Sequence, residues 1–235
     1  MTSSAIILAA GFGKRMLPLT NAIPKPMVKI KGVPLIQHLI ELLDYIGIDQ
    51  ICINVHYKSD LLIDYLDSLN NSKIIISDET NHLLDTGGGI KAAFNLLSNE
   101  SAFVFNSDIF WEKKYSTQLI NMSKKFDSKD MLAFLGLSNL NQIRGYDGFG
   151  DFTFLNNDLI ERYDNNKSVL YPYVYSGVQI IKKSLLSIIQ KKVFSVNMAW
   201  DLAIKSNSLY GFRLDNNLKH IGTPEMVDES NNEKN

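Results

Sequence analysis

The chain has 235 residues, 45% of them hydrophobic, and its 24 Lys and Arg against 25 Asp and Glu give a net charge of -1. This length is enough for one large domain with a substantial core. The balanced charge excludes a general polyanion-binding surface, so we expect no nucleic-acid partner and only local phosphate-binding residues. The single cysteine excludes an intrachain disulfide, the N-terminus lacks a basic n-region, and no apolar stretch approaches membrane-spanning length. We therefore expect a cytoplasmic protein with no membrane partner.

Apolar strand-like runs alternate with amphipathic helical runs in the first half of the chain. We predict strands over residues 5–9, 50–55, 73–77 and 102–106, and helices over residues 34–46, 60–69 and 89–97. This alternation is typical of βαβ units. It predicts an α/β fold with a mostly parallel central sheet and helices on both faces.

The second half of the chain has a mixed pattern. We predict strands over residues 131–137, 150–155, 159–163 and 173–181, and helices over residues 183–190 and 198–205. No linker separates the halves, so we predict a single domain over residues 1–225 with two lobes, 1–110 and 111–225. Residues 226–235 are predicted to form a polar, frayed tail.

A glycine turn and a basic pair follow the first predicted strand. Gly11 and Gly13 leave backbone N–H groups unshielded, so a polyphosphate can lie against the main chain. Arg15 adds a planar fork of donors that suits phosphate oxygens. Lys25 stands between two prolines, which hold the chain extended and fix where its charge points. The segment predicts a triphosphate clamp followed by a second anion site.

Two better-known phosphate-binding motifs do not fit this segment. A dinucleotide fingerprint needs a third glycine where Met16 stands, and a Walker loop needs Lys followed by Ser or Thr where Lys14 and Arg15 stand. An ordinary strand-to-helix turn is the remaining alternative for the glycines alone.

The run L-A-A-G-F-G-K-R-M-L-P-L-T, followed by P-K-P, resembles the signature of the sugar-phosphate nucleotidyltransferases. These enzymes join a nucleoside triphosphate to a sugar 1-phosphate and release pyrophosphate. The resemblance extends from Ile6 to about Glu225. It implies a Rossmann-like three-layer fold with a mostly parallel central sheet and a mixed acceptor-binding lobe. It also assigns nucleotide binding to residues 1–110 and sugar binding to residues 111–225.

Asp108 closes an apolar strand at the place where ligands gather in open α/β sheets, so it is a candidate Mg²⁺ ligand. The matching strand of the family ends in (G/N)-x-D, with its Asp on the metal. Asn106 takes the first position of that motif here and could also bond the sugar. A strand-end Asp that only caps a turn is the structural alternative.

Asp85 and Thr86 precede three glycines at the start of a predicted helix, which permits close backbone approach by a base or a ribose. The run resembles the (E/D)-T-G-G-G of the subgroup that makes UDP-N-acetylmuramate from N-acetylmuramate 1-phosphate, and we favour UTP as the nucleotide on this resemblance. Heptose 1-phosphate guanylyltransferases usually read L-A-G-G at the first motif, and Ala9-Ala10 argues against them. A flexible helix start is the structural alternative.

The resemblance implies three sets of site residues. Catalysis is assigned to Arg15, Lys25 and Asp108. Nucleotide binding is assigned to Leu8, Ala9, Ala10, Gly11, Gly13, Lys14, Arg15, Lys25, Asp85, Thr86, Gly87 and Gly88. Sugar binding is assigned to Asn106, Gly150, Asp151, Tyr175, Ser176 and Gly177, because a pyranose suits an Asp, a Ser, backbone amides and aromatic rings.

His220 departs from the family pattern. The motif (D)-x-G-T-P-E places the second metal-binding Asp where this chain has His220. Imidazole is a poor partner for Mg²⁺. One protein carboxylate then suffices, or His220 acts through water, or Mn²⁺ replaces Mg²⁺. Asp201 or Asp215 could also substitute for the missing carboxylate, and a buried neutral histidine is the structural alternative.

These residues predict in-line nucleotidyl transfer. Lys14, Arg15 and the backbone of residues 11–13 hold the β- and γ-phosphates, and Lys25 holds the α-phosphate and the attacking phosphate together. Guanylyl, cytidylyl or thymidylyl transfer to mannose, heptose or glucose 1-phosphate or to phosphocholine remains open, as does a non-catalytic nucleotide-binding regulatory subunit. We expect a monomer or small homo-oligomer.

Overall fold

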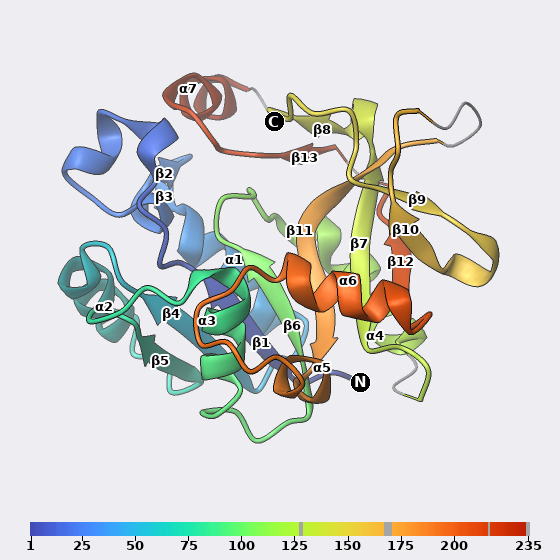
Figure 1. Ribbon diagram of the computed structural model, residues 1–235. Coiled ribbons are helices and arrows are strands. Elements are labelled where there is room, and N and C mark those ends of the chain that lie inside the picture. Colours follow the sequence, from blue (N-terminus) through green and yellow to red (C-terminus); the bar gives the residue numbers. More distant parts are fainter. Residues whose placement is uncertain (127–128, 167–170, 216, 234–235) are drawn as a thin grey trace.

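The computed structural model describes residues 1–126, 129–166, 171–215 and 217–233 (Figure 1). Its strands are β1 Ser4–Leu8, β2 Lys29–Ile30, β3 Val33–Pro34, β4 Gln50–Val55, β5 Ile74–Asp78, β6 Ser101–Asn106, β7 Ala133–Asn139, β8 Ile143–Arg144, β9 Phe152–Phe154, β10 Ile160–Arg162, β11 Tyr173–Lys182, β12 Leu209–Arg213 and β13 Leu218–Lys219. Its α-helices are α1 Leu35–Tyr45, α2 Ser59–Ser68, α3 Asp85–Ala93, α4 Ser116–Lys125, α5 Lys183–Ser187, α6 Asn197–Lys205 and α7 Pro224–Asn232.

A single large sheet runs through both halves of the chain. Its strands follow the order β10-β9-β11-β6-β1-β4-β5, and β7 adds to β11 and carries β12. The pairs β6–β1, β1–β4 and β4–β5 are parallel, whereas β11 is antiparallel to β6, with Val178 opposite Phe105. The first half therefore contributes a parallel sheet and the second half a mixed extension, in which β12 is parallel to β7 and the other pairs are antiparallel; this confirms the predicted α/β fold.

Helices cover both faces of this sheet and make three layers (Figure 1). Helices α1, α2 and α4 share one hydrophobic cluster, and α3, α5 and α6 share a second. The central strands are apolar on both sides, as buried parallel strands are: Ile7 of β1 joins the first cluster, and its neighbour Ile6 joins the second. Cys52 of β4 is fully buried, and burial raises the pKa of its thiol to about 12, so it packs as an apolar group.

Two helices were not predicted. Helix α4 was not predicted, because its sequence is polar apart from the few side chains that it buries, such as Leu119 and Met122. The polar tail expected from residue 226 is largely helix α7, which Pro224 begins and which buries Val227 and Ser230. Residues 234–235 of that tail lie outside the described residues.

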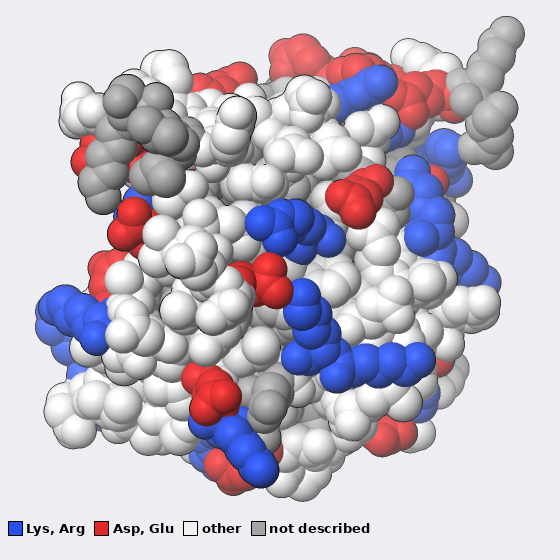
Figure 2. All heavy atoms as spheres, turned by 90° about the vertical axis from the view of Figure 1, so that its right-hand side faces the viewer, with Lys and Arg blue, Asp and Glu red and all other residues white. Residues whose placement is uncertain are grey.

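The surface carries both signs of charge. Figure 2 shows Lys and Arg side chains in a line over one face, with Asp and Glu side chains beside them. Asp158 pairs with both Lys125 and Arg213, which ties α4 to β12. Within the parts of the chain that the structure describes, no helix has the length and apolar character needed to cross a lipid bilayer.

Candidate active site

The carboxyl ends of three neighbouring parallel strands meet at one cavity. Ala9 follows β1, Asn54 lies near the end of β4, and Asn106 ends β6. The cavity at this edge has a volume of about 400 Å³, and we call it the first cavity. It is lined by twelve of the predicted site residues: Leu8, Ala9, Ala10, Gly11, Gly13, Lys14, Arg15, Lys25, Asp85, Thr86, Asn106 and Asp108. Ligands bind at this edge in open α/β sheets, as the sequence predicts.

The loop after β1 is folded so that its basic residues reach the first cavity. Gly13 has φ +61°, and a Cβ there would lie 2.9 Å from Cγ2 of Thr20 and 3.0 Å from Cβ of Lys25. The Thr20 hydroxyl donates a hydrogen bond of 2.9 Å to the Gly13 carbonyl oxygen. The left-handed glycine therefore lets the chain turn back against the Lys25 segment, where a larger residue would be strained. At Gly11, by contrast, a Cβ would meet nothing within 4 Å.

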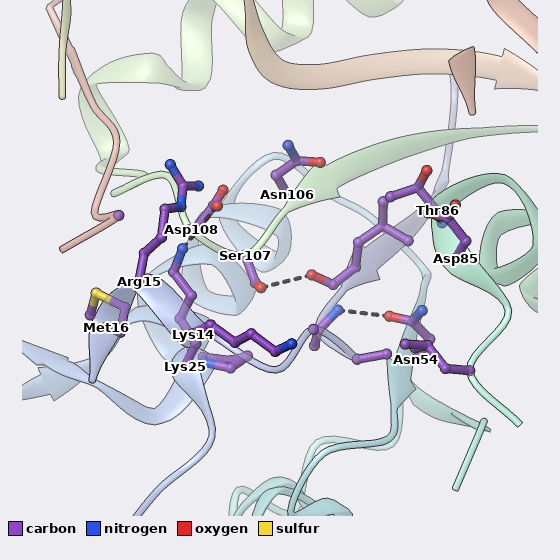
Figure 3. A pocket seen from close by; sticks show the side chains of 18 residues that line it. Lys14, Arg15, Met16, Lys25, Asn54, Asp85, Thr86, Asn106, Ser107 and Asp108 are labelled. Atoms are coloured by element: carbon purple, nitrogen blue, oxygen red, sulfur yellow. Dashed lines mark hydrogen bonds and ion pairs between the residues drawn. The ribbon is translucent and has the colours of Figure 1, made fainter. Parts of the chain in front are cut away.

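Lys25 points from its proline-flanked segment to Asp108. Pro24 is extended, but Lys25 begins a single 3-10 turn that ends at Met27, so the segment is less extended than predicted. The Lys25 Nζ lies 3.0 Å from Oδ2 of Asp108, and only 12% of the lysine side chain is exposed. Figure 3 shows Arg15, Lys25 and Asp108 gathered at one end of the first cavity, with Asp85 and Thr86 at the other. Positive charge is thus concentrated at one end.

Asp108 is flanked by two cationic or potentially cationic groups. Its Oδ2 lies 3.0 Å from Nζ of Lys25 and 3.1 Å from Nε2 of His220. Burial favours the neutral acid, but the hydrogen bond from His220 and the charge of Lys25 outweigh it and hold the pKa of Asp108 well below its usual range. The carboxylate is therefore ionised throughout the neutral range.

His220 reaches Asp108 because residues 219–222 run alongside the end of β6. His220 forms a β-bridge with Ile109, and the Ile221 N–H donates to the Asp108 carbonyl oxygen at 2.7 Å. The Nδ1 of His220 lies 3.1 Å from the Gly145 carbonyl oxygen, so both ring nitrogens face oxygen acceptors. Only the doubly protonated ring donates to both.

Asp108 has the features of a carboxylate that can hold a hard cation. Its Oδ1 is buried and has no hydrogen-bond partner among the described residues. No group of three or more His, Cys, Asp and Glu side chains that could hold a metal occurs in those residues. Mg²⁺ is usually bound by one or two carboxylates plus phosphate and water oxygens, so a single Asp beside a phosphate site fits this ion.

A second cavity adjoins the first. It has a volume of about 320 Å³ and shares Leu8, Asp85, Thr86 and Asn106 with the first cavity. Three of the predicted sugar-binding residues line it: Asn106, Asp151 and Tyr175. The Asp151 carboxylate accepts hydrogen bonds from the Tyr146 hydroxyl at 3.0 Å and from the Tyr175 N–H at 2.8 Å. The two cavities together make a site for two ligands.

The other three predicted sugar-binding residues do not line the second cavity. Ser176 is fully buried, and its hydroxyl pairs with that of Ser138 at 2.9 Å. Gly150 has φ +112° beside Pro172, and Gly177 has φ +74° beside Ile109. The Ser176 side chain is buried and the two glycines have none, so no side chain of these residues is presented to a ligand. They shape the backbone around the cavity instead.

Gly87 and Gly88 lie outside both cavities, and their surroundings give them another role. Their N–H groups both donate to the Phe194 carbonyl oxygen, at 2.8 and 3.1 Å. A Cβ at Gly87 would overlap the Phe194 ring, and one at Gly88 would overlap the Lys192 carbonyl oxygen. In the structure residues 192–194 make a close approach to these two glycines, and contact of the glycines with a base or ribose stays a prediction.

The sequence prediction missed several lining residues. In the first cavity these are Met16, Pro26, Asn54, Leu83, Ser107 and Gly222. In the second cavity they are Phe152, Arg162, Gln179, Ser195, Val196, Asn197 and Trp200. Asn54 had a usable signal, a polar residue inside the apolar strand β4. Its Oδ1 accepts the Ala9 N–H at 2.7 Å, and its Nδ2 donates to Glu79 at 2.7 Å.

Comparisons with known proteins agree with this arrangement. The nucleotidyl transferase family model matches residues 4–150. N-acetylmuramate alpha-1-phosphate uridylyltransferase of Caulobacter vibrioides is 32% identical over 225 residues, which are 94% of this chain and 92% of that enzyme. Mannose-1-phosphate guanyltransferase of Saccharomyces cerevisiae is 26% identical over 226 residues, and the chain spans only 61% of its length.

Among solved structures, HddC from Yersinia pseudotuberculosis complexed with GMP-PN superimposes with a TM-score of 0.76 at 25% identity, over 98% of both chains. The family match covers more than half of the chain, and the similarity to the Caulobacter enzyme extends through both halves of the sheet. The chain belongs to the nucleotidyl transferase family, which confirms the resemblance carried by its sequence motifs.

Proposed function

We propose that this protein transfers a uridylyl group from UTP to N-acetylmuramate 1-phosphate, forming UDP-N-acetylmuramate and pyrophosphate. The observation that carries the chemistry is the ion pair between Lys25 Nζ and Asp108 Oδ2, which are 3.0 Å apart. Asp108 lies two residues after Asn106, which lines both cavities. The choice of base and sugar is supported by the 32% identity to the Caulobacter enzyme over 94% of the chain. With these substrates the protein would act in the cytoplasm, in cell-wall sugar recycling.

The first cavity supplies the charge that a triphosphate needs. Lys14, Arg15 and the open backbone at Gly11 line it at the loop after β1. These groups would hold the β- and γ-phosphates and stabilise the negative charge that develops on the leaving pyrophosphate. Because backbone N–H groups held by the loop need little reorganisation during the reaction, they stabilise the transition state more than water does.

Lys25 would hold the two reacting phosphates together. Its ammonium group is nearly buried beside Asp108, so its charge is poorly screened by solvent. An oxygen of the acceptor phosphate attacks the α-phosphorus, a P–O bond forms, and the bond from that phosphorus to the bridging oxygen of pyrophosphate breaks. The acceptor phosphate is ionised at neutral pH, so no general base is required, and positioning supplies most of the rate enhancement.

Asp108 would hold Mg²⁺ through Oδ1, which has no hydrogen-bond partner in the described part of the chain, and the ion would add positive charge beside the phosphates. Lys25 and His220 already contact the other oxygen, Oδ2. His220 then acts as a holder of the Asp108 carboxylate and not as a metal ligand, since its Nε2 faces that carboxylate. Mn²⁺ remains an alternative ion because it accepts the same oxygen ligands.

A second candidate function is guanylyl transfer to mannose or heptose 1-phosphate. The yeast relative is a mannose-1-phosphate guanyltransferase, and the HddC structure holds GMP-PN. This reaction would use Arg15, Lys25 and Asp108 in the same roles and would change only the base and the sugar.

The deciding experiment measures pyrophosphate release by the purified protein with Mg²⁺ and each of the four nucleoside triphosphates. The acceptors are the 1-phosphates of N-acetylmuramate, glucose, mannose and heptose. Release with UTP and the muramate supports the proposal. Release with GTP and mannose or heptose 1-phosphate replaces it with the second candidate, and no release with Mg²⁺ or Mn²⁺ overturns the catalytic function.

A further inference from the structure

The second cavity contains a cation that the transfer reaction itself does not need. Arg162 ends β10 and lines the second cavity but not the first. Among the described residues that line the second cavity, it is the one Lys, Arg or His. The cations suited to phosphate, which are Lys14, Arg15 and Lys25, all line the first cavity. A neutral sugar would not require a guanidinium in its pocket, so Arg162 indicates a second negative charge on the acceptor.

We propose that Arg162 recognises a carboxylate on the acceptor sugar and selects acidic over neutral sugar 1-phosphates. This inference rests on the proposed function, in which the acceptor is N-acetylmuramate 1-phosphate, a sugar with a lactyl carboxylate. The phosphate lies at Lys25, the pyranose fills the second cavity, and the lactyl carboxylate reaches the guanidinium. The arginine thus gives the cavity its acceptor specificity.

The guanidinium is held in one orientation before any ligand arrives. Its Cζ lies 4.8 Å from the centroid of the Phe152 ring and 5.5 Å from that of Trp200, both of which line the same cavity. Its Nε and Nη2 donate to Oδ1 of Asp201 at 3.1 and 2.9 Å, and Nη2 also donates to Oδ1 of Asn197 at 2.8 Å. Such preorganisation lowers the entropy cost of binding a carboxylate.

One end of the guanidinium remains available to a ligand. Among the described residues, no acceptor lies within hydrogen-bonding distance of Nη1 of Arg162, which carries two N–H donors. The Asp201 carboxylate is 55% exposed, so solvent screens its charge and it neutralises the arginine only in part. Two carboxylates line the cavity with it: Asp151 accepts from the Tyr146 hydroxyl and the Tyr175 N–H, and Asp85 accepts from the Thr86 N–H at 2.6 Å. Nη1 can therefore donate a charge-assisted hydrogen bond to an incoming carboxylate.

The walls of the cavity suit the rest of the acceptor. Trp200 is held by a hydrogen bond of 2.8 Å from its Nε1 to Oε1 of Gln179, and its ring packs edge-on against Tyr175 at 4.9 Å. A fixed indole offers an apolar surface to one face of a pyranose. Asn106 and Asp151 add polar groups at the cavity wall for hydroxyl and amide groups. Arg162 is thus the feature that separates an acidic sugar from a neutral one.

The test compares Arg162→Gln with the wild-type protein on two matched pairs of acceptors. The pairs are N-acetylmuramate with N-acetylglucosamine 1-phosphate, and glucuronate with glucose 1-phosphate, and the readout is kcat/KM for pyrophosphate release. For the acidic acceptors we expect a loss of about 10- to 100-fold, as for other hydrogen bonds to charged groups. For the neutral acceptors we expect a change within about threefold.

Arg213→Gln is the matched control. Arg213 also stacks on an aromatic ring, with its Cζ 3.7 Å from the Phe154 centroid, and it also pairs with an aspartate, Asp158, but it lines neither cavity. This variant should leave both acceptor classes unchanged. Binding of UTP and the melting temperature of Arg162→Gln show whether that variant is folded.

The outcomes separate this inference from the proposed function. In one outcome the wild-type protein turns over the muramate, and Arg162→Gln loses activity equally with acidic and neutral acceptors. This outcome would keep the proposed function and overturn the inference, because Arg162 would then bind a group that all acceptors share, such as the phosphate. Failure of the muramate together with a preference for glucuronate over glucose that Arg162→Gln abolishes would overturn the function and support the inference. Turnover of neutral acceptors alone by the wild-type protein would overturn both.

Discussion

The two cavities of this protein are built in different ways from the same sheet edge. The first cavity takes its basic groups from one short stretch of chain, residues 14–25, and its carboxylates from Asp85 and from Asp108, two residues after β6. The second shares four residues with the first and takes most of its other side chains from β9, β10, β11 and α6, which are far apart in the sequence. A site made of backbone turns and adjacent residues leaves a motif in the sequence, whereas a site made by packing distant elements does not.

The two cavities also differ in their expected roles: the first would carry out the transfer reaction, and the second would select the acceptor sugar. The first cavity combines Lys25, Arg15 and Asp108, groups suited to phosphates of any nucleotide or sugar. The second combines Trp200, Tyr175 and Arg162, groups whose contacts depend on which sugar is present. We therefore expect changes in the first cavity to lower the rate with every substrate, and changes in the second to alter the ranking of substrates.

The largest expected effect is that of Lys25→Ala. Loss of this nearly buried ammonium group should lower kcat for pyrophosphate release by about 10³-fold, equivalent to about 4 kcal/mol, with every active acceptor. Circular dichroism should show the fold intact. Lys29→Ala is the matched control, an exposed lysine of β2 four residues further on, and it should change kcat by less than about twofold. Near-normal turnover in Lys25→Ala would remove Lys25 from the mechanism.

A pair of glycine variants distinguishes packing from ligand contact. Gly88→Ala places a Cβ against the Lys192 carbonyl oxygen, so we expect it to lower the free energy of unfolding by about 2 kcal/mol. Gly11→Ala has open space around its Cβ and lines the first cavity, so it should keep the stability and weaken nucleotide binding. Thermal unfolding and nucleotide titration measure the two effects. Weaker nucleotide binding by a fully stable Gly88→Ala would restore the predicted role of that glycine in base contact.

His220→Asp tests how many carboxylates the metal site needs. The variant places a second carboxylate beside Asp108. Without a cation the two carboxylates repel each other, and with Mg²⁺ present they bind the ion together. We expect millimolar Mg²⁺ to raise the free energy of unfolding of the variant by about 1 kcal/mol more than that of the wild type, as linkage to a bound ion predicts. Melting temperatures with and without Mg²⁺ give the difference, and Ca²⁺-free buffer with EDTA is the control. An equal response of both proteins would show that position 220 does not contribute to the cation site.

Much of the fold followed from sequence pattern. The central strands were predicted within one residue of β1, β4, β5 and β6, because buried parallel strands are apolar runs bounded by polar residues. Helix α4 was not predicted, because Leu119 and Met122 are the only buried apolar residues among its ten. Arg162 had no signal, because a charged residue near the end of a short edge strand is ordinary, and only the packing of β10 against α6 shows that it lines a cavity.

The last prediction concerns how the contribution of Asp108 to the free energy of unfolding depends on pH. The pKa of Asp108 is lowered in the folded protein, where burial is outweighed by the His220 hydrogen bond and the Lys25 charge. A lowered folded pKa stabilises the protein above the unfolded pKa of about 3.9, and this contribution disappears as the pH falls through the folded pKa. Wild type should therefore exceed Asp108→Asn in free energy of unfolding by the largest amount near neutral pH.

That difference should shrink as the pH falls below about 4, because the Asp108 carboxylate then takes up a proton in the unfolded chain but stays ionised in the folded protein until the pH reaches its lower folded pKa. One pKa unit corresponds to about 1.4 kcal/mol, so chemical unfolding at pH 7, 5, 4 and 3 resolves the trend. The exposed-site control, Asp67→Asn, should differ from wild type by no more than about 0.5 kcal/mol at each pH. A difference for Asp108→Asn that stays constant down to pH 3 would mean that Lys25 and His220 do not stabilise the charged carboxylate. The first cavity would then lose the electrostatic feature that sets it apart from the second.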